Sequence, residues 1–156
     1  MVIGSKPLNG MSGHDAGRQL LAQMYRELTG KALPEIALTD RGKPYFVTGT
    51  LHFSISHTDT RVFCVLSERE VGIDAEPTTR QIREELADKI LSDPERQRYA
   101  AAGDQRQALL RLWVLKEAYA KQCGRGWGSY LYETDFDPND PRIRELDGCF
   151  VATIEL

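Results

Sequence analysis

Three acidic residues on two separate segments are the residues of this chain whose types and spacing best fit a chemical role. Asp74 and Glu76 lie in segment 71–76, VGIDAE, which has the pattern of a β-strand. Because residues i and i+2 of a strand point to the same side, both carboxylates project from one face. Two adjacent carboxylates repel each other, so one is protonated unless a cation holds both. Oxygen ligands suit Mg²⁺, which takes one or two carboxylates and leaves its other positions to water and substrate phosphates. The pair therefore indicates chemistry on a phosphate or pyrophosphate.

The third acid, Glu117, lies in a later segment with helical periodicity. Trp113, Glu117 and Lys121 are spaced at i, i+4 and i+8 and therefore share one stripe of that helix. A Glu–Lys pair at this spacing is also an ordinary feature of a solvated helix face, where it contributes about 0.2–0.5 kcal/mol. Exposed strand ends often carry two acids as well. Taken separately, each motif is therefore more often structural than functional.

Two shorter motifs contain residues that could contact a phosphate group. Gly42-Lys43-Pro44 has the pattern of a turn into a strand, and Lys43 offers a point charge to a phosphate. Ser56 and His57 end a predicted strand, where neighbours point to opposite faces, so a Ser–His nucleophile is not expected. The sequence has no glycine-rich turn of the kind that cradles phosphates. Neither motif identifies a function by itself.

Length and composition favour a single domain. The chain has 156 residues and 41% hydrophobic content, which is enough for an ordinary core. A net charge of −3 argues against a general nucleic-acid-binding protein. No apolar run approaches the roughly 18 residues of a membrane span, and the N-terminus lacks the apolar core of a signal peptide, so we expect no membrane partner. Cys64, Cys123 and Cys149 form no CxxC pair, which predicts reduced thiols and a cytoplasmic protein.

The elements that must position these residues follow from hydrophobic periodicity. Ser12 and Ser92 mark two helix starts with capping signals, and Gly30 ends the first helix. Three strand candidates follow one another with short polar connections, which predicts an antiparallel meander whose last strand ends at Asp74 and Glu76. The predicted elements are a helix at about 15–30, a short extended run and a turn within 34–46, strands at 51–56, 61–66 and 71–75, helices at about 80–91 and 105–123, and a strand at 149–156.

The order of these motifs resembles that of the 4′-phosphopantetheinyl transferase superfamily. Gly42-Lys43-Pro44 comes first, then FSISH at 53–57, VGIDAE at 71–76 and WVLKEAYAK at 113–121. The Asp-x-Glu motif and the Trp-x-x-Lys-Glu-x-x-x-Lys motif at this separation form a strong signature. The resemblance covers about 15–128, and it is closer to the type that activates surfactin synthetase than to the smaller trimeric holo-acyl-carrier-protein synthases.

The resemblance implies an Mg²⁺-dependent enzyme that moves phosphopantetheine from coenzyme A to a serine of an apo acyl or peptidyl carrier protein, while adenosine 3′,5′-bisphosphate leaves. It implies that Asp74, Glu76 and Glu117 hold Mg²⁺ against the pyrophosphate. Glu117, or a water on the metal, would take the serine proton, and Lys121 would stabilise the attacked phosphate. The residues that the resemblance places against coenzyme A are Arg18, Lys43, Pro44, Ser56, His57, Lys116 and Lys121.

The fold that the resemblance implies is α+β, with an antiparallel sheet packed against helices and two pseudo-symmetric halves that enclose the coenzyme. Within one domain, 1–156, the halves would be about 1–70 and 71–156. Relatives of this type usually have several more strands before the first helix, so we expect a shortened first half. A thinner first half leaves a sheet edge uncovered, which is compatible with either a monomer or a dimer.

Two other functions remain open. The first is a non-catalytic relative that binds coenzyme A or a carrier protein, which a shortened first half would favour. The second is an Mg²⁺-dependent phosphohydrolase, which the three acids alone would also support. No nucleic-acid partner is expected for any of the three functions.

Overall fold

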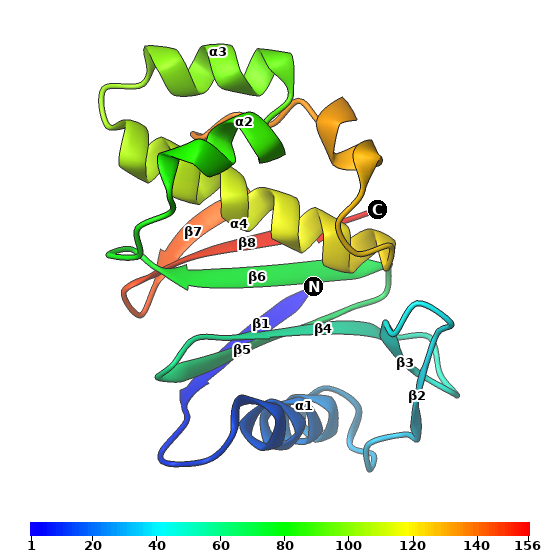
Figure 1. Ribbon diagram of the computed structural model, residues 1–156. Coiled ribbons are helices and arrows are strands. Elements are labelled where there is room, and N and C mark those ends of the chain that lie inside the picture. The colour runs from blue at the N-terminus through cyan, green and yellow to red at the C-terminus, as the bar shows by residue number, and fades with distance from the viewer.

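The computed structural model describes residues 1–156 and contains two three-stranded antiparallel sheets stacked between helices (Figure 1). The first sheet has the strand order β1-β5-β4, with β1 at Val2–Pro7, β5 at Arg61–Ser67 and β4 at His52–His57. The second sheet has the order β6-β8-β7, with β6 at Val71–Pro77, β8 at Cys149–Glu155 and β7 at Ile143–Leu146. A two-stranded hairpin is formed by β2 at Ile36–Leu38 and β3 at Pro44–Phe46.

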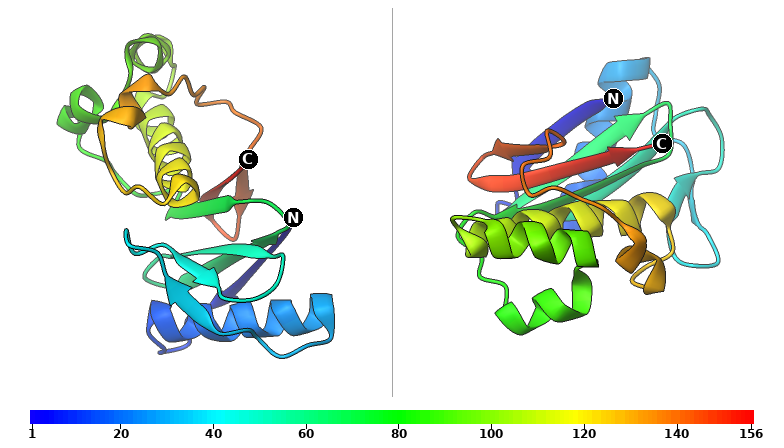
Figure 2. Two further views of the ribbon diagram at one scale, coloured as in Figure 1. Left: turned by 90° about the vertical axis from the view of Figure 1, so that its right-hand side faces the viewer. Right: turned by 90° about the horizontal axis from the view of Figure 1, so that it is seen from above.

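The long helices cover the outer faces of the two sheets. Helix α1 (Gly13–Thr29) lies on the first sheet and helix α4 (Gln105–Cys123) lies on the second (Figure 2). The short helices α2 (Ala87–Ile90) and α3 (Asp93–Ala101) lie outside α4, and the 3₁₀ turns are Glu84–Leu86 and Ser129–Glu133. None of the helices combines the length and the apolar character that a membrane-spanning helix needs.

The core consists of three layers of apolar side chains. One layer, which includes Leu21 and Val62, lies between α1 and the first sheet. A second layer, which includes Phe63 and Ile73, lies between the two sheets. The third and largest layer, which includes Leu112, lies between the second sheet and α4. The two sheets are therefore held together by burial of apolar surface as well as by polar contacts.

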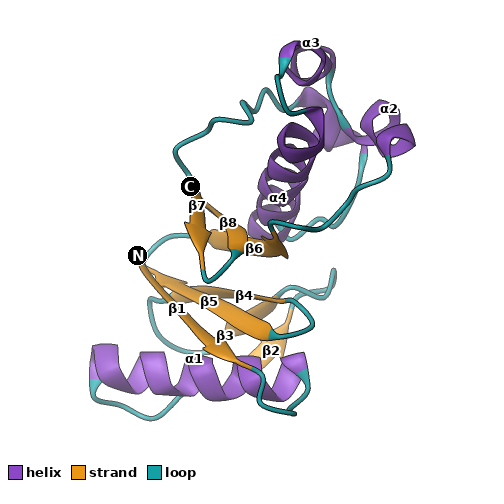
Figure 3. Cartoon of the chain, turned by 90° about the vertical axis from the view of Figure 1, so that its left-hand side faces the viewer, coloured by secondary structure: helices purple, strands orange, loops and turns teal.

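The two sheets have the same connectivity (Figure 3). In each sheet the first strand is followed by the long helix, and the last strand in sequence lies in the middle, paired with the other two. This repeat, together with the match to the implied α+β fold, supports our proposal of two pseudo-symmetric halves that meet near residue 70.

The predicted helix starts are confirmed by their capping contacts. The Ser12 side chain accepts a hydrogen bond of 3.0 Å from the Asp15 N–H, and Gly30 ends α1 in the left-handed conformation with φ of 71°. Ser92 and Glu95 form a capping box at the start of α3. The helix predicted at 105–123 matches α4.

Gly72 allows α4 to lie directly against β6. A Cβ atom at this position would lie 2.0 Å from the main-chain oxygen of Ala118 and 2.4 Å from the main-chain nitrogen of Gln122. Backbone atoms cannot move aside as a flexible side chain does, so any larger residue would push the strand and helix apart. Gly72, Asp74 and Glu76 occupy every second position of β6, so their side chains lie on one face of the strand. The two acids therefore project towards α4, on the side where Gly72 contacts that helix.

Two predictions about the elements are wrong. The strand at 71–75 does not complete a meander with β5. It pairs with β8, from Val71 opposite Glu155 to Pro77 opposite Cys149. A short polar connection occurs both in hairpins and in crossings between sheets, so it did not identify the partner strand.

The single helix predicted at about 80–91 is also wrong. The segment forms only a 3₁₀ turn and the four-residue helix α2, and no side chain caps the start of either. Strands β1 and β7 were not predicted. Strand β1 pairs with β5, from Val2 opposite Leu66 to Pro7 opposite Arg61.

Candidate active site

Strands β4 and β6, the facing edges of the two sheets, lie side by side without forming a β-ladder (Figure 1). Main-chain N–H groups of β6 donate to serine hydroxyls of β4 instead of to main-chain oxygens of a neighbouring strand. Ser54 Oγ accepts the N–H of Ile73 at 3.1 Å, and Ser56 Oγ accepts the N–H of Ala75 at 3.3 Å. These bonds satisfy buried donors of an edge strand and hold the two sheets together next to Asp74.

The three acids and Lys121 line one cavity of about 330 Å³ between β4, β6 and α4. Strand β6 contributes Asp74 and Glu76, and α4 contributes Glu117 and Lys121 from the same stripe of the helix. The other polar or aromatic side chains that line the cavity are Ser56, His57 and Trp113. The structure therefore brings together residues from both predicted motifs.

Asp74 is buried and has one satisfied and one unsatisfied oxygen. Its Oδ1 atom accepts hydrogen bonds from Ser56 Oγ at 2.9 Å and from Lys121 Nζ at 2.7 Å. Its Oδ2 atom is buried and has no hydrogen-bond partner. A buried carboxylate oxygen without a partner is energetically unfavourable, so it is a natural position for a cationic ligand.

The other two acids are each held by a donor from a nearby loop. Glu76 forms an ion pair with Arg80, whose guanidinium also lies 5.8 Å from the centre of the Trp113 ring. Glu117 accepts a hydrogen bond from the indole N–H of Trp127. Trp127 in turn stacks on Trp113 with ring centres 5.1 Å apart. As the side chains stand, no three acids, histidines or cysteines are close enough together to hold a metal ion.

Burial raises the pKa of Glu117 above its ordinary value. The hydrogen bond from Trp127 acts in the opposite direction, and the negative charges of Asp74 and Glu76 raise the pKa further. Lys121 partly offsets these charges. The three carboxylates therefore interact electrostatically, which is the condition under which a shared cation stabilises them.

A second cavity of about 300 Å³ adjoins the first. The two cavities share Ile55, Glu117 and Lys121 and so form one continuous groove. Lys43 and Pro44 line the second cavity from the first half of the chain, and the loop after α4, with Gly124, Gly126 and Trp127, lines it from the second half.

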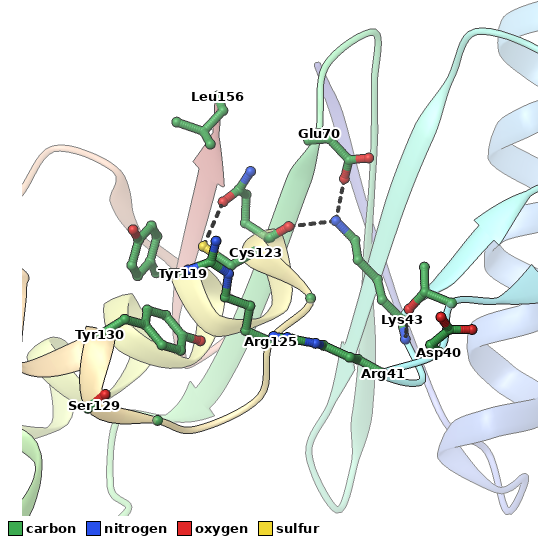
Figure 4. Close-up of a pocket in the computed structure, with 14 residues that line it drawn as sticks. Asp40, Arg41, Lys43, Glu70, Tyr119, Cys123, Arg125, Ser129, Tyr130 and Leu156 are labelled. Carbon is green, nitrogen blue, oxygen red and sulfur yellow. Dashed lines mark hydrogen bonds and ion pairs between the residues drawn. The ribbon is translucent and has the colours of Figure 1, made fainter.

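Lys43 bridges the two halves of the molecule (Figure 4). Its Nζ atom donates a 2.6 Å hydrogen bond to the main-chain oxygen of Gln122 and forms an ion pair with Glu70. The Gln122 carbonyl lies at the C-terminal end of α4, where a cation is favoured by the helix dipole. Lys43 and Arg41 line both this groove and a larger cavity of about 1060 Å³, which Arg125 also lines.

The structure places the other predicted coenzyme contacts at different distances from the acids. His57 lines the acid cavity, and its ring lies so close to the start of α1 that a Cβ at Gly13 would come within 2.4 Å of it. Arg18, on α1, lines neither cavity of the groove.

The prediction that Lys116 contacts coenzyme A needs correction. Lys116 is fully buried, and its Nζ atom lies 2.7 Å from Glu95 Oε2 and donates hydrogen bonds to the oxygens of Leu131 and Thr134. It lines neither cavity of the groove. Adjacent residues of a helix point about 100° apart, so Lys116 projects towards α3 while Glu117 projects towards the groove.

Two residues at the site were not predicted. Arg80 was assigned to a charged helix, although it follows β6 in a loop and turns back to Glu76. Trp127, which follows the helix predicted at 105–123, was given no role. The available signal was a tryptophan between two glycines just beyond the helix stripe that carries Glu117.

The comparisons with known proteins agree with the arrangement of these residues. Residues 70–148 match the 4′-phosphopantetheinyl transferase superfamily. The chain is 34% identical to the 4′-phosphopantetheinyl transferase AcpT of Salmonella typhi over 146 residues, which cover 90% of this chain and 72% of the relative. It is 37% identical to the 4′-phosphopantetheinyl transferase gsp of Aneurinibacillus migulanus over 87 residues, or 54% of this chain and 36% of the relative.

A shorter match of 77 residues relates the chain to the 4′-phosphopantetheinyl transferase Sfp of Bacillus subtilis at 35% identity, covering 48% of this chain and 34% of the relative. The superfamily match contains both acidic motifs and Lys121. The chain belongs to the 4′-phosphopantetheinyl transferase superfamily.

Proposed function

We propose that this protein transfers 4′-phosphopantetheine from coenzyme A to a serine hydroxyl of an apo acyl or peptidyl carrier protein in an Mg²⁺-dependent reaction. The observation that supports the proposal is the single cavity lined by Asp74, Glu76, Glu117 and Lys121 in a member of this superfamily. The matched relatives from Salmonella typhi, Aneurinibacillus migulanus and Bacillus subtilis bear the name of this activity.

The residues of the acid cavity fit a magnesium ion. All three candidate ligands are carboxylates, and Asp74 Oδ2 is a buried oxygen without a partner. Asp74, Glu76 and Glu117 would hold the ion once the contacts of Arg80 and Trp127 open. When bound, the ion would supply charge neutralisation for the pyrophosphate of coenzyme A.

Lys121 and Glu117 are the residues that we assign to the chemical step. The serine oxygen attacks the phosphorus that carries pantetheine, and the bond from that phosphorus to the oxygen of adenosine 3′,5′-bisphosphate breaks. Lys121 is more exposed than its ion-pair partner Asp74. It turns from Asp74 to an oxygen of the attacked phosphate and stabilises the negative charge of that phosphate. Glu117 takes the serine proton, because its carboxylate lines the same cavity as Lys121.

The second cavity is our candidate for the adenosine end of coenzyme A. Lys43 and Pro44 line it, and it continues into the acid cavity, so the coenzyme would lie along the groove between the two halves. His57 and Arg18 stay proposed coenzyme contacts, although His57 lines the acid cavity and Arg18 lines neither cavity. A phosphate would compete with Glu70 and the Gln122 carbonyl for the ammonium of Lys43.

The cellular setting that we propose is the cytoplasm. The three cysteines, Cys64, Cys123 and Cys149, are all free in the structure, and burial raises the pKa of the Cys64 thiol to about 12. Cysteines that form no disulfide bonds are typical of proteins in a reducing compartment.

A mass-shift assay tests the proposed function. The purified protein is incubated with coenzyme A, MgCl₂ and each of several apo acyl and peptidyl carrier proteins, and intact masses are measured. We expect at least one carrier to gain the mass of one phosphopantetheine, and chelation of Mg²⁺ to prevent the gain. If no carrier shifts, the proposal fails.

Two of the candidate metal ligands already have partners, because Glu76 is paired with Arg80 and Glu117 accepts a hydrogen bond from Trp127. This observation favours a second candidate function, that of a non-catalytic relative that binds coenzyme A or a carrier protein. In this case the two donors would stay in place and no metal site would form. Calorimetry that detects binding of coenzyme A without Mg²⁺, combined with no mass shift in any carrier, would support this candidate over the transferase.

A further inference from the structure

We infer that Ser56 is a positioning residue for Asp74. It holds one carboxylate oxygen so that the other, Oδ2, is presented to a divalent cation. The inference rests on the proposed function, because it assumes a cation at the acid cavity. It also gives Ser56 a different role from the coenzyme contact that the sequence resemblance implied.

The hydroxyl of Ser56 has no hydrogen left for a coenzyme phosphate. Ser56 is 6% exposed, and its Oγ atom accepts the N–H of Ala75 at 3.3 Å. Its single O–H is donated to Asp74 Oδ1 at 2.9 Å. A serine hydroxyl has one donor, so Ser56 can bind either Asp74 or a phosphate, but not both.

The arrangement of donors around Asp74 determines which of its oxygens is available. Ser56 and Lys121 both donate to Oδ1, and nothing donates to Oδ2. When Lys121 turns to the attacked phosphate, as we propose, Ser56 becomes the remaining donor that prevents the carboxylate from rotating. Groups of this kind, which orient a metal ligand without touching the metal, typically affect metal affinity by about 10- to 100-fold.

Ser54 provides a matched control on the same strand. It lies two residues before Ser56, is 7% exposed, and accepts the N–H of Ile73 at 3.1 Å. Its hydroxyl has no carboxylate partner. Ser54→Ala and Ser56→Ala therefore each remove one acceptor of a β6 N–H group, but only Ser56→Ala also removes the donor that holds Asp74.

The experiment measures the requirement for Mg²⁺ in two ways. The first is the MgCl₂ concentration that gives half-maximal transfer of phosphopantetheine to an apo carrier protein. The second, which does not depend on catalysis, is the MgCl₂ concentration that gives half-maximal binding of coenzyme A in calorimetry. We expect Ser56→Ala to raise both values by about 10-fold or more, with transfer largely recovered at saturating Mg²⁺.

The control variants separate positioning from simple support of the fold. Both alanine variants should lose a few degrees of thermal stability, but Ser54→Ala should keep the Mg²⁺ requirement of the parent protein. Ser56→Thr keeps the hydroxyl and should have the same Mg²⁺ requirement as the parent protein.

Each other outcome has a defined meaning. Equal shifts in the two alanine variants, or no shift in Ser56→Ala, overturn the inference. A weaker affinity for coenzyme A at saturating Mg²⁺, without a change in Mg²⁺ requirement, identifies Ser56 as a coenzyme contact and overturns it as well. If no carrier is modified but coenzyme binding depends on Mg²⁺, the proposed function fails while the binding arm still decides the role of Ser56. If the parent protein shows neither transfer to any carrier nor Mg²⁺-dependent binding of coenzyme A, both fail.

Discussion

Two lysines of helix α4 each form an ion pair with a carboxylate of another element, at the same distance but in different surroundings. The distance from nitrogen to oxygen is 2.7 Å both in the Lys116–Glu95 pair and in the Lys121–Asp74 pair. The Lys116–Glu95 pair is completely buried between α3 and α4, whereas the Lys121 side chain is 32% exposed at the groove. Distance alone therefore does not separate a structural pair from one placed to act on a ligand.

The two pairs differ in how many of their polar atoms already have partners. All three donors of the Lys116 ammonium are used, by Glu95, Leu131 and Thr134. Glu95 in turn accepts from the N–H groups of Ser92 and Phe136 and from the Thr134 hydroxyl. In the other pair, Asp74 Oδ2 has no partner. The Lys121–Asp74 pair, which still has a polar atom without a partner, is therefore the one that can exchange its contacts for those of a substrate.

Replacement of Asp74 should have the largest effect on function. We expect Asp74→Ala to reduce transfer below detection, because it removes the oxygen that we assign to the cation, while the protein stays folded. Asp140→Ala is the matched control, since Asp140 is a partly buried carboxylate paired with Arg142 away from the groove. The measurement is the mass shift of an apo carrier protein, with circular dichroism to verify folding. Full activity in Asp74→Ala would contradict the metal assignment.

Replacement of Lys116 should have the largest effect on stability. Lys116→Met leaves the carboxylate of Glu95 buried without its cation, so we expect the free energy of unfolding to fall by about 3–5 kcal/mol in denaturant titrations. A second change, Glu95→Gln, removes that uncompensated charge and should restore part of the loss. If Lys116→Met instead unfolds with the stability of the parent protein, the pair does not hold α3 and α4 together as we describe.

Lys121 should show the opposite balance between stability and activity. Lys121→Ala breaks a pair whose lysine is 32% exposed and whose Asp74 keeps the hydrogen bond from Ser56, so we expect the free energy of unfolding to fall by less than it does in Lys116→Met. Transfer should fall by about 10²–10³-fold, because a donor aimed at the transition-state charge is lost. The turnover rate at saturating coenzyme A, measured beside the unfolding curve, tests both parts. A loss of stability as large as that of Lys116→Met would erase the contrast between the pairs.

The sequence predicts the parts of the site that depend on local geometry. The i, i+2 rule places Asp74 and Glu76 on one face of β6, and the i, i+4 rule places Glu117 and Lys121 on one stripe of α4. The caps at Ser12 and Ser92 are local as well, and both predicted helix starts are confirmed.

The parts that failed depend on partners that are distant in sequence. Lys116 could not be separated from the groove residues because its partner, Glu95, belongs to another helix. The strand partner of β6 is β8, which follows it after the whole helical segment. The hydrogen bond from Ser56 to Asp74 was not predicted for the same reason, since it crosses from one sheet to the other.

Replacement of the loop residues that bind Glu76 and Glu117 should have the smallest effect. Trp127→Phe keeps an aromatic ring against Trp113 but removes the indole N–H that binds Glu117. A net hydrogen bond contributes about 0.5–1.5 kcal/mol, so loss of this competitor should lower the half-saturating Mg²⁺ concentration by roughly two- to tenfold. Arg80→Gln, which removes the charge paired with Glu76, should act in the same direction. Calorimetric binding of coenzyme A at stepped MgCl₂ concentrations measures both. An increased Mg²⁺ requirement in either variant would mean that the loop donor supports the candidate metal ligands instead of competing with the cation. The contacts around the Lys121–Asp74 pair would then be as fixed as those around the buried Lys116–Glu95 pair.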